Sequence, residues 1–182
     1  MRKTFTTCAT VLLLAWLAGC ASTKGQTDSR TPGNLIDDEA IEILIAREVR
    51  KADPGLKKAH LSVVSFNGIV LLLGQVDSEV LKRQATTAAT KIRKARTVHN
   101  EMEISGPISR VARSNDTWLT SKVKSRLLAR RDIRGARIKV VTENSIVYLM
   151  GLVTREHADK AVAVAQKVFG VQKIVKVFEY ID

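Results

Sequence analysis

The side chains able to do acid–base, nucleophilic or metal chemistry are few and scattered in this sequence. Its three histidines, His60, His99 and His157, have no recurring partner, and no H-x-x-x-H pair, G-x-S-x-G motif or glycine-rich phosphate loop occurs. Glu79 and Glu156 recur at the starts of predicted helices, where a carboxylate stabilises the helix N-terminus. We therefore expect no catalytic residues, no metal site and no cofactor, in a protein that is not an enzyme.

Cys20 is the one residue whose surroundings indicate covalent chemistry. A basic start, Arg2 and Lys3, precedes the apolar run VLLLAWLAG, which has the length of a secretory h-region and is too short to span a bilayer permanently. The run ends in LAGC, the pattern of a bacterial lipobox, in which the cysteine is acylated and the chain is cut before it. We predict a signal peptide at residues 1–19 and acylation, palmitate included, at Cys20. The alternative is an ordinary cleaved signal followed by a coincidental cysteine.

The residues after Cys20 indicate where the anchored protein resides. Ala21 and Ser22 follow the cysteine, with no aspartate just after it, which is typical of an outer-membrane rather than an inner-membrane address. Small and polar residues then predict a flexible tether over residues 20–33. We expect a lipid-anchored protein of the outer membrane that faces the periplasm, where nucleic acid is not a normal partner.

Trp118 does not fit the helix that contains it. In NDTWLTSKVKSRLL, residues 115–128, Leu119 and two further apolar residues recur every four positions and define a core face. Trp118 lies about 260° around the helix from Leu119, and Lys122, Ser125 and Leu128 lie on its side. Tryptophan favours membrane interfaces, which suggests a lipid-contacting face. The alternative is that Trp118 packs against another part of the chain or under a linker.

Positive charge is concentrated in the same part of the chain. The formal net charge is +12, and residues 115–182 carry 13 Lys/Arg against 7 Asp/Glu, whereas residues 34–105 carry 11 against 10. One short segment holds five arginines: Arg126, Arg130, Arg131, Arg134 and Arg137. A basic face of this kind is either simply solvated or binds anionic lipid, nucleic acid or acidic glycan. Near an anionic membrane, each Lys or Arg contributes about 1 kcal/mol.

An internal repeat reveals the elements that position these residues. Residues 60–76 align without gaps on residues 137–153, and eight of the 17 positions are identical. Each block predicts a β-hairpin around an Asn-containing turn. Gly74 and Gly151 end the second strand of each hairpin, where we expect a positive φ or close packing to require glycine.

The flanks of the hairpins repeat as well. An amphipathic helix precedes each hairpin, and an alanine-rich helix and a final strand follow it. Acidic residues, Asp38 and Asp116 among them, suit the start of the first helix in each unit. The sequence thus predicts an α+β protein with two tandem αββαβ units, at residues 34–105 and 115–182, joined by a linker at 106–114. Each unit is expected to be a three-stranded mixed sheet packed on two helices.

The two αββαβ units, each with "GxV" after its hairpin, resemble BON domains. The motif N-D-T-W-x-T-x-K-V makes the second unit similar to that of outer-membrane lipoproteins with two BON domains. One departure is Lys94-Ala95 in the first unit, where the second has Gly170-Val171, and we interpret it as a looser turn within the same fold.

The resemblance implies that the first helix of the second unit binds anionic phospholipid such as phosphatidylglycerol, and that the protein supports outer-membrane integrity, with a possible place at division sites. The implied lipid-binding residues are Trp118, Leu119, Lys122, Ser125, Arg126 and Leu128. The corresponding helix of the first unit has Ala40 in place of Trp118, and its start, DDEAIE, is acidic enough to repel anionic lipid. The alternative function is a periplasmic adaptor that holds envelope or division proteins without recognising lipid.

Overall fold

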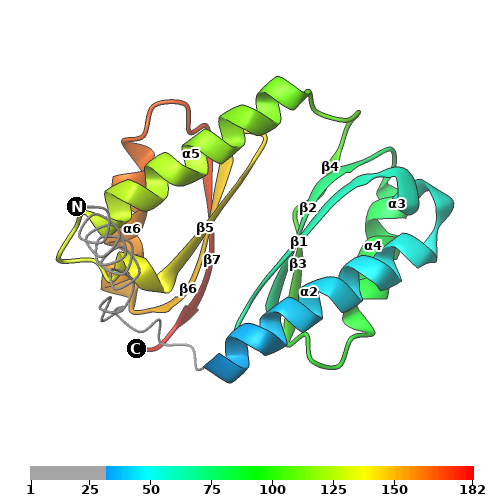
Figure 1. Ribbon diagram of the computed structural model, residues 1–182, viewed down its shortest axis with the longest axis horizontal. Coiled ribbons are helices and arrows are strands. Elements are labelled where there is room, and N and C mark those ends of the chain that lie inside the picture. The colour runs from blue at the N-terminus through cyan, green and yellow to red at the C-terminus, as the bar shows by residue number, and fades with distance from the viewer. Residues whose placement is uncertain (1–31) are drawn as a thin grey trace, which may run out of the picture.

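The computed structural model describes residues 32–182 and contains two αββαβ units (Figure 1). This confirms the predicted α+β fold and the predicted order of elements in each unit. The predicted signal peptide, Cys20 and nearly all of the predicted tether lie outside the described residues. Pro32 and Gly33, which were also assigned to the tether, already belong to the first described helix.

The first unit places its longest helix against a mixed sheet. Strand β2 is central, because it pairs antiparallel with β1 and parallel with β3 and β4. The last strand is interrupted, so that β3 and β4 are two short segments of one edge. The elements are α2 (Pro32–Ala52), α3 (Pro54–Lys58), β1 (His60–Phe66), β2 (Ile69–Val76), α4 (Glu79–Thr90), β3 (Thr97–Asn100) and β4 (Glu103–Ile104).

The second unit repeats this arrangement with an unbroken third strand. Strand β6 is central, antiparallel to β5 and parallel to β7. The elements are α5 (Arg110–Leu128), the short 3₁₀ helix η2 (Gly135–Arg137), β5 (Ile138–Glu143), β6 (Ile146–Val153), α6 (Arg155–Gln166) and β7 (Lys173–Tyr180).

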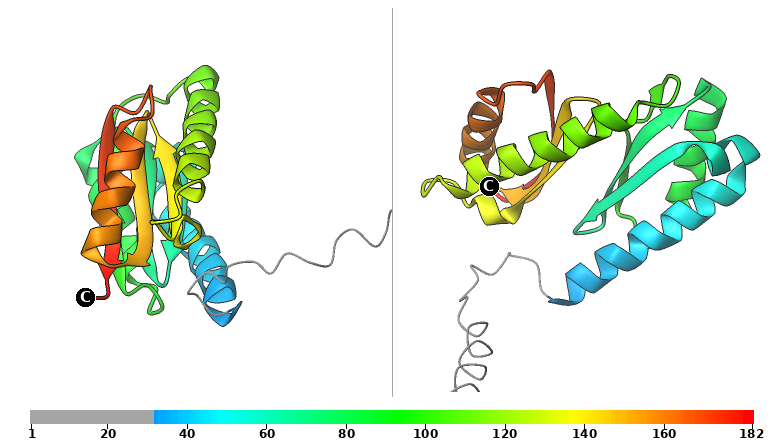
Figure 2. Two further views of the ribbon diagram at one scale, coloured as in Figure 1. Left: turned by 90° about the vertical axis from the view of Figure 1, so that its left-hand side faces the viewer. Right: turned by 45° about the horizontal axis from the view of Figure 1, so that its top comes forward.

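The two sheets pack face to face, and the helices cover their outer sides (Figures 1 and 2). Within each unit, one face of the sheet packs on its two helices. A third apolar cluster joins the opposite faces of the two sheets, and its buried members are Val64, Phe66, Leu71, Leu73, Tyr148, Met150 and Val177. The second unit on its own would therefore expose an apolar sheet face to water.

Polar contacts surround this shared apolar layer. Gln75 Nε2 donates to Glu143 Oε1 at 2.8 Å in a buried hydrogen bond between the units. Arg96 of the first unit forms an ion pair with Glu179 of the second, with Nη2 and Oε1 2.7 Å apart. Because these bonds join the two units directly, the linker between them is not their only connection.

Helix α5 begins earlier than the sequence predicts. Its N-cap is Ser109, whose Oγ accepts from the backbone N–H of Ala112 at 3.1 Å. The helix therefore takes in residues 110–114, which were assigned to the linker. Asp116 is not at the helix start, and neither is Asp38, which lies six residues into α2.

The two buried aspartates instead hold the hairpin turns. Asp116 accepts from the backbone N–H groups of Asn144 and Ser145 at 2.9 and 2.8 Å. Asp38 accepts equivalent bonds, at 2.8 and 2.9 Å, from the first hairpin turn. Asn144 and Ser145 both have positive φ, 49° and 62°, a region that L-residues avoid, so these bonds stabilise a strained turn.

Gly74 and Gly151 permit the two strands of each hairpin to approach closely. A Cβ on Gly74 would lie 1.9 Å from the carbonyl oxygen of His60, and one on Gly151 would lie 2.7 Å from that of Arg137. Gly74 also has a φ of 124°, which other residues rarely adopt.

Candidate functional site

Helix α5 presents two different faces. Its inner face packs against the sheet and α6, and the buried residues are Asp116, Leu119, Val123 and Leu127. Its outer face carries large apolar side chains in water: Trp118 is 50% exposed and Leu128 is 55% exposed. The earlier helix start adds Val111, which is 79% exposed and lies seven residues, two helical turns, before Trp118. Val111 was not among the predicted site residues, because residues 106–114 were predicted to be a linker.

Trp118 and Lys122 form a pair on the outer face. The Lys122 Nζ lies 3.8 Å from the centroid of the Trp118 ring, within the range of a cation–π interaction. With half of its surface in water, Trp118 does not fill the interface between the units or a space under the linker. The structure thus contradicts the alternative in which Trp118 is a packing residue.

Hydroxyl side chains beside Trp118 bond to their own helix. Thr117, Ser121 and Ser125 each donate to the backbone carbonyl four residues earlier, at 3.1, 3.0 and 2.8 Å. Their donor hydrogens are already satisfied, which lowers the cost of moving this face out of water. Ser125, a predicted site residue, therefore contributes a small side chain whose hydroxyl hydrogen already has an acceptor.

One predicted site residue, Leu119, does not lie on the predicted face, and another, Arg126, makes a bond that was not predicted. Leu119 is fully buried in the core of the second unit and cannot contact a membrane while the domain is folded. Its assignment to the lipid-binding face was wrong, because the same periodicity that makes it a core residue turns it away from Trp118. Arg126 is exposed, and its Nη1 donates to the carbonyl oxygen of Lys167 at 2.6 Å, which ties α5 to the turn after α6.

The arginines beyond α5 do not form one basic face with Trp118. Arg130 makes a bidentate bond to Asp132, and this hydrogen bond lowers the pKa of the Asp132 carboxyl to about 2. Arg134 and Arg137 line a separate cavity of about 140 Å³ with residues of β6 and α6. The cation that the structure places directly against Trp118 is Lys122, and Arg126 lies two turns further along α5.

The histidines lie on separate elements. His60 begins β1, His99 is on β3, and His157 is in the first turn of α6, where its Nδ1 lies 3.1 Å from Thr154 Oγ1. Among residues 32–182, no group of three or more His, Cys, Asp or Glu side chains is placed to hold a metal ion. No described helix is both long and apolar enough to cross a bilayer.

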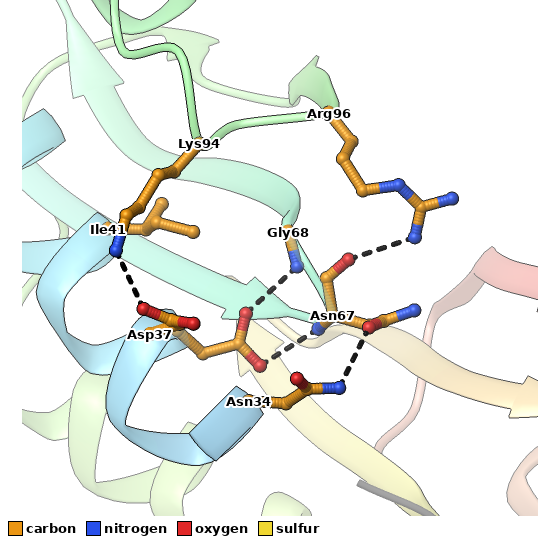
Figure 3. A pocket seen from close by; sticks show the side chains of 8 residues that line it. Asn34, Asp37, Ile41, Asn67, Gly68, Lys94 and Arg96 are labelled. Carbon is orange, nitrogen blue, oxygen red and sulfur yellow. Dashed lines mark hydrogen bonds and ion pairs between the residues drawn. The ribbon is translucent and has the colours of Figure 1, made fainter. Parts of the chain in front are cut away.

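A hollow of about 210 Å³ lies at the N-terminal end of α2, beside the first hairpin turn (Figure 3). Its two cations already have partners: Lys94 Nζ lies 2.7 Å from Asp37 Oδ1, and Arg96 is paired with Glu179. Asp38 accepts from the backbone N–H groups of Asn67 and Gly68, two of the residues labelled in Figure 3. With its charges neutralised, the hollow is better suited to holding the turn than to binding an anion.

Helix α2 is less acidic on its surface than its sequence suggests. Asp38 is buried on the hairpin turn, Glu42 accepts from Lys139 at 3.0 Å, and Asp37 is paired with Lys94. The fourth acidic residue of this start, Glu39, is exposed, so the expected repulsion of anionic lipid stays a prediction. The difference that remains is the absence of an aromatic residue and of a Trp–Lys pair.

Comparison with known proteins identifies both units. The BON domain model matches residues 37–106 and 115–182. The chain is 38% identical to the outer membrane lipoprotein DolP of Haemophilus influenzae over 164 residues, which cover 90% of this chain and 85% of that protein. It is 34% identical to a 21 kDa hemolysin of Actinobacillus pleuropneumoniae, over 85% and 80% of the two chains.

A more distant relative is the osmotically-inducible protein Y of Escherichia coli, 27% identical over 85% of this chain and 78% of that protein. The similarity to an outer membrane lipoprotein agrees with the predicted localisation, a lipid-anchored protein of the outer membrane that faces the periplasm. The chain belongs to the BON-domain family, as a two-domain protein of the DolP type.

Proposed function

We propose that the outer face of α5 binds anionic phospholipid at the periplasmic surface of the outer membrane. The observation that carries this proposal is the half-exposed Trp118 with the Lys122 ammonium over its ring. An indole placed at the boundary of acyl chains and head groups gains apolar contact while its N–H stays with polar groups. Lys122 can exchange the ring for a lipid phosphate as the indole enters the membrane.

Charge and apolar surface support the same orientation. Leu128 and Val111 extend the apolar surface along α5, and Arg126 adds a cation at its C-terminal end. Each such cation near an anionic surface contributes about 1 kcal/mol, and the attraction is screened by salt. The surface is therefore suited to phosphatidylglycerol rather than to a neutral lipid.

In this proposal, acylated Cys20 anchors the chain and the second BON domain reads the lipid composition of the same membrane. The protein acts without catalysis and supports the integrity of the outer membrane. Gathering at division sites is the further expectation that the family resemblance provides. The competing proposal is an adaptor that uses the same surface to hold an envelope protein.

Replacement of Trp118 by Glu tests the proposal. The chain is used from residue 20 with Cys20→Ser, so that it keeps both units but is not acylated, because an isolated second unit would expose its sheet face. We expect W118E to lose binding to phosphatidylglycerol vesicles in a flotation assay and to unfold at the same urea concentration as the parent. The matched control is Val80→Glu, since Val80 is 54% exposed on α4.

Unchanged vesicle binding by W118E would refute the lipid face on α5. Loss of the fold in W118E, with V80E still folded, would show that Trp118 supports the structure and would equally contradict the proposal.

A further inference from the structure

Phe169 is the most exposed large apolar side chain among the described residues, at 88% of its surface. It lies in the turn between α6 and β7, outside every helix and strand. A single exposed apolar residue is normal on a protein surface, so a role for Phe169 depends on what surrounds it.

The neighbours of Phe169 fix its outward direction. Val168 is 2% exposed and belongs to the core, and Val171 packs against the same core from the other side of the turn. The backbone N–H of Val171 donates to the carbonyl oxygen of Val168 at 3.2 Å, which closes the turn. Phe169 thus stands at the tip of a turn whose flanking residues are both anchored inward.

This turn lies against α5. Gly170, with a φ of 98°, comes so close that a Cβ on it would lie 3.1 Å from Leu119 Cδ2. Arg126 donates to the carbonyl oxygen of Lys167 at the other end of the turn. The turn therefore packs beside the stretch of α5 from residue 119 to 126, which also carries Lys122 on its outer face.

We propose that Phe169 is a second membrane anchor, which enters the acyl region beside the Trp118 face of α5. This inference rests on the proposed function and adds a contact that lies outside helix α5. The cations that flank the turn, Arg126 and Lys167, are exposed and suit the phosphates around an inserted phenyl ring. Because the turn is held by the core and by α5, insertion costs little ordering of the chain.

The first unit offers a matched comparison. By the register of Lys94 with Gly170, the residue at the tip of its turn is Arg93, which is exposed. In both units, a backbone N–H just after this turn donates to a carbonyl oxygen of the hairpin turn. The N–H of Arg96 donates to Gly68 at 2.8 Å, and that of Gln172 donates to Ser145 at 3.0 Å. The two units thus share the turn, and only the second places an aromatic ring at its tip.

A relocated tryptophan tests the inference in the unacylated chain with Cys20→Ser. Trp118→Phe with Phe169→Trp moves the only indole of the chain from residue 20 to position 169. We expect its emission to shift to the blue with phosphatidylglycerol vesicles and to be quenched by bromine on the acyl chains. The control is Trp118→Phe with Arg93→Trp, whose indole we expect to remain unquenched. In a separate binding assay, Phe169→Ser weakens vesicle partitioning by about tenfold.

The outcomes separate the two proposals. Quenching of Trp118 in the unsubstituted sequence, without quenching at position 169, would overturn the second anchor and leave the α5 face intact. Quenching at neither position would contradict both. Equal quenching at positions 93 and 169 would mean general adsorption of the protein and would also overturn the inference.

Discussion

The Lys122 ammonium lies 3.8 Å from the centre of the Trp118 ring, one helical turn away on the outer face of α5. The pair joins the two properties that an anionic bilayer surface requires, a cation for phosphate and an indole for the interface. Its effects on lipid binding and on stability are separable, because neither residue belongs to the core.

Lys122→Gln removes the charge and keeps the length of the side chain nearly unchanged. We expect partitioning into phosphatidylglycerol vesicles to weaken about fivefold, which corresponds to about 1 kcal/mol. Lys91→Gln, at an exposed cation at the end of α4, is expected to change binding much less. Equal effects of the two substitutions in a flotation assay would show that only the net charge matters.

The hairpin turns depend on the buried aspartates. Each oxygen of the Asp116 carboxylate accepts one backbone N–H of the turn, and Asp116→Asn replaces one of these oxygens with an NH2 group. Because one buried N–H then loses its acceptor, we expect the free energy of unfolding to fall by about 1–3 kcal/mol. Asp38→Asn is expected to have a similar or larger effect, since Asp38 also accepts from Ser65 Oγ at 2.7 Å. The exposed Asp159→Asn serves as control in urea denaturation. An Asp116→Asn variant as stable as this control would refute the structural role.

The ion pair between the units predicts a dependence of stability on pH. The hydrogen bond from Arg96 lowers the pKa of Glu179 below its ordinary 4.5. The stabilisation by Glu179 is therefore complete above about pH 5.5 and is lost as the pH falls through 4.5 to the lower folded pKa. We expect Glu179→Gln to be less stable than the parent at neutral pH, and this difference to shrink in acid. A difference that is constant from pH 7 to about 3 in thermal unfolding would contradict this assignment.

The packing of the two sheets is tested through Tyr148. Burial raises the pKa of the Tyr148 phenol, and glutamates of the first unit add to the effect. We expect residues 109–182 alone to self-associate and to bind apolar dyes, because the sheet face that carries Met150 and Val177 is uncovered in this fragment.

The titration of Tyr148 gives a second readout. In absorbance titrations, Tyr148 should ionise at lower pH in this fragment than in the two-unit chain, because its phenol is no longer buried between the sheets. A monomeric fragment with the same titration as the two-unit chain would contradict the shared core.

Periodicity and the repeat carry most of the information that the sequence holds about this fold. Leu119 and Ile41 were placed in their cores by the four-residue spacing, and helical geometry alone placed Trp118 on the outside. The packing of the sheets was not predicted, although β2 contains a signal for it. Leu71 and Leu73 alternate with Val70 and Leu72, so both faces of that strand are apolar, as expected for a sheet covered on both sides.

Other features depend on contacts that are distant in sequence. Asp116 meets Ser145 across 29 residues, and an aspartate near the start of an apolar pattern is more simply read as a helix cap. Phe169 follows the last periodic position of α6, so no helical or strand pattern indicates where its ring points. For Leu119, the four-residue spacing predicted the core correctly, and only its listing among the residues that the family resemblance implied to bind lipid was wrong.

The central claim, that Trp118 contacts anionic lipid, is tested most directly by the emission of this tryptophan. The chain has two tryptophans, and Trp16 lies in the predicted signal peptide, so Trp118 is the only indole in the chain from residue 20. We expect its emission to shift to the blue on titration with phosphatidylglycerol vesicles, not with phosphatidylcholine vesicles, and the shift to weaken as salt is added. An unchanged spectrum from the folded two-unit protein would contradict the lipid-binding face and favour the adaptor.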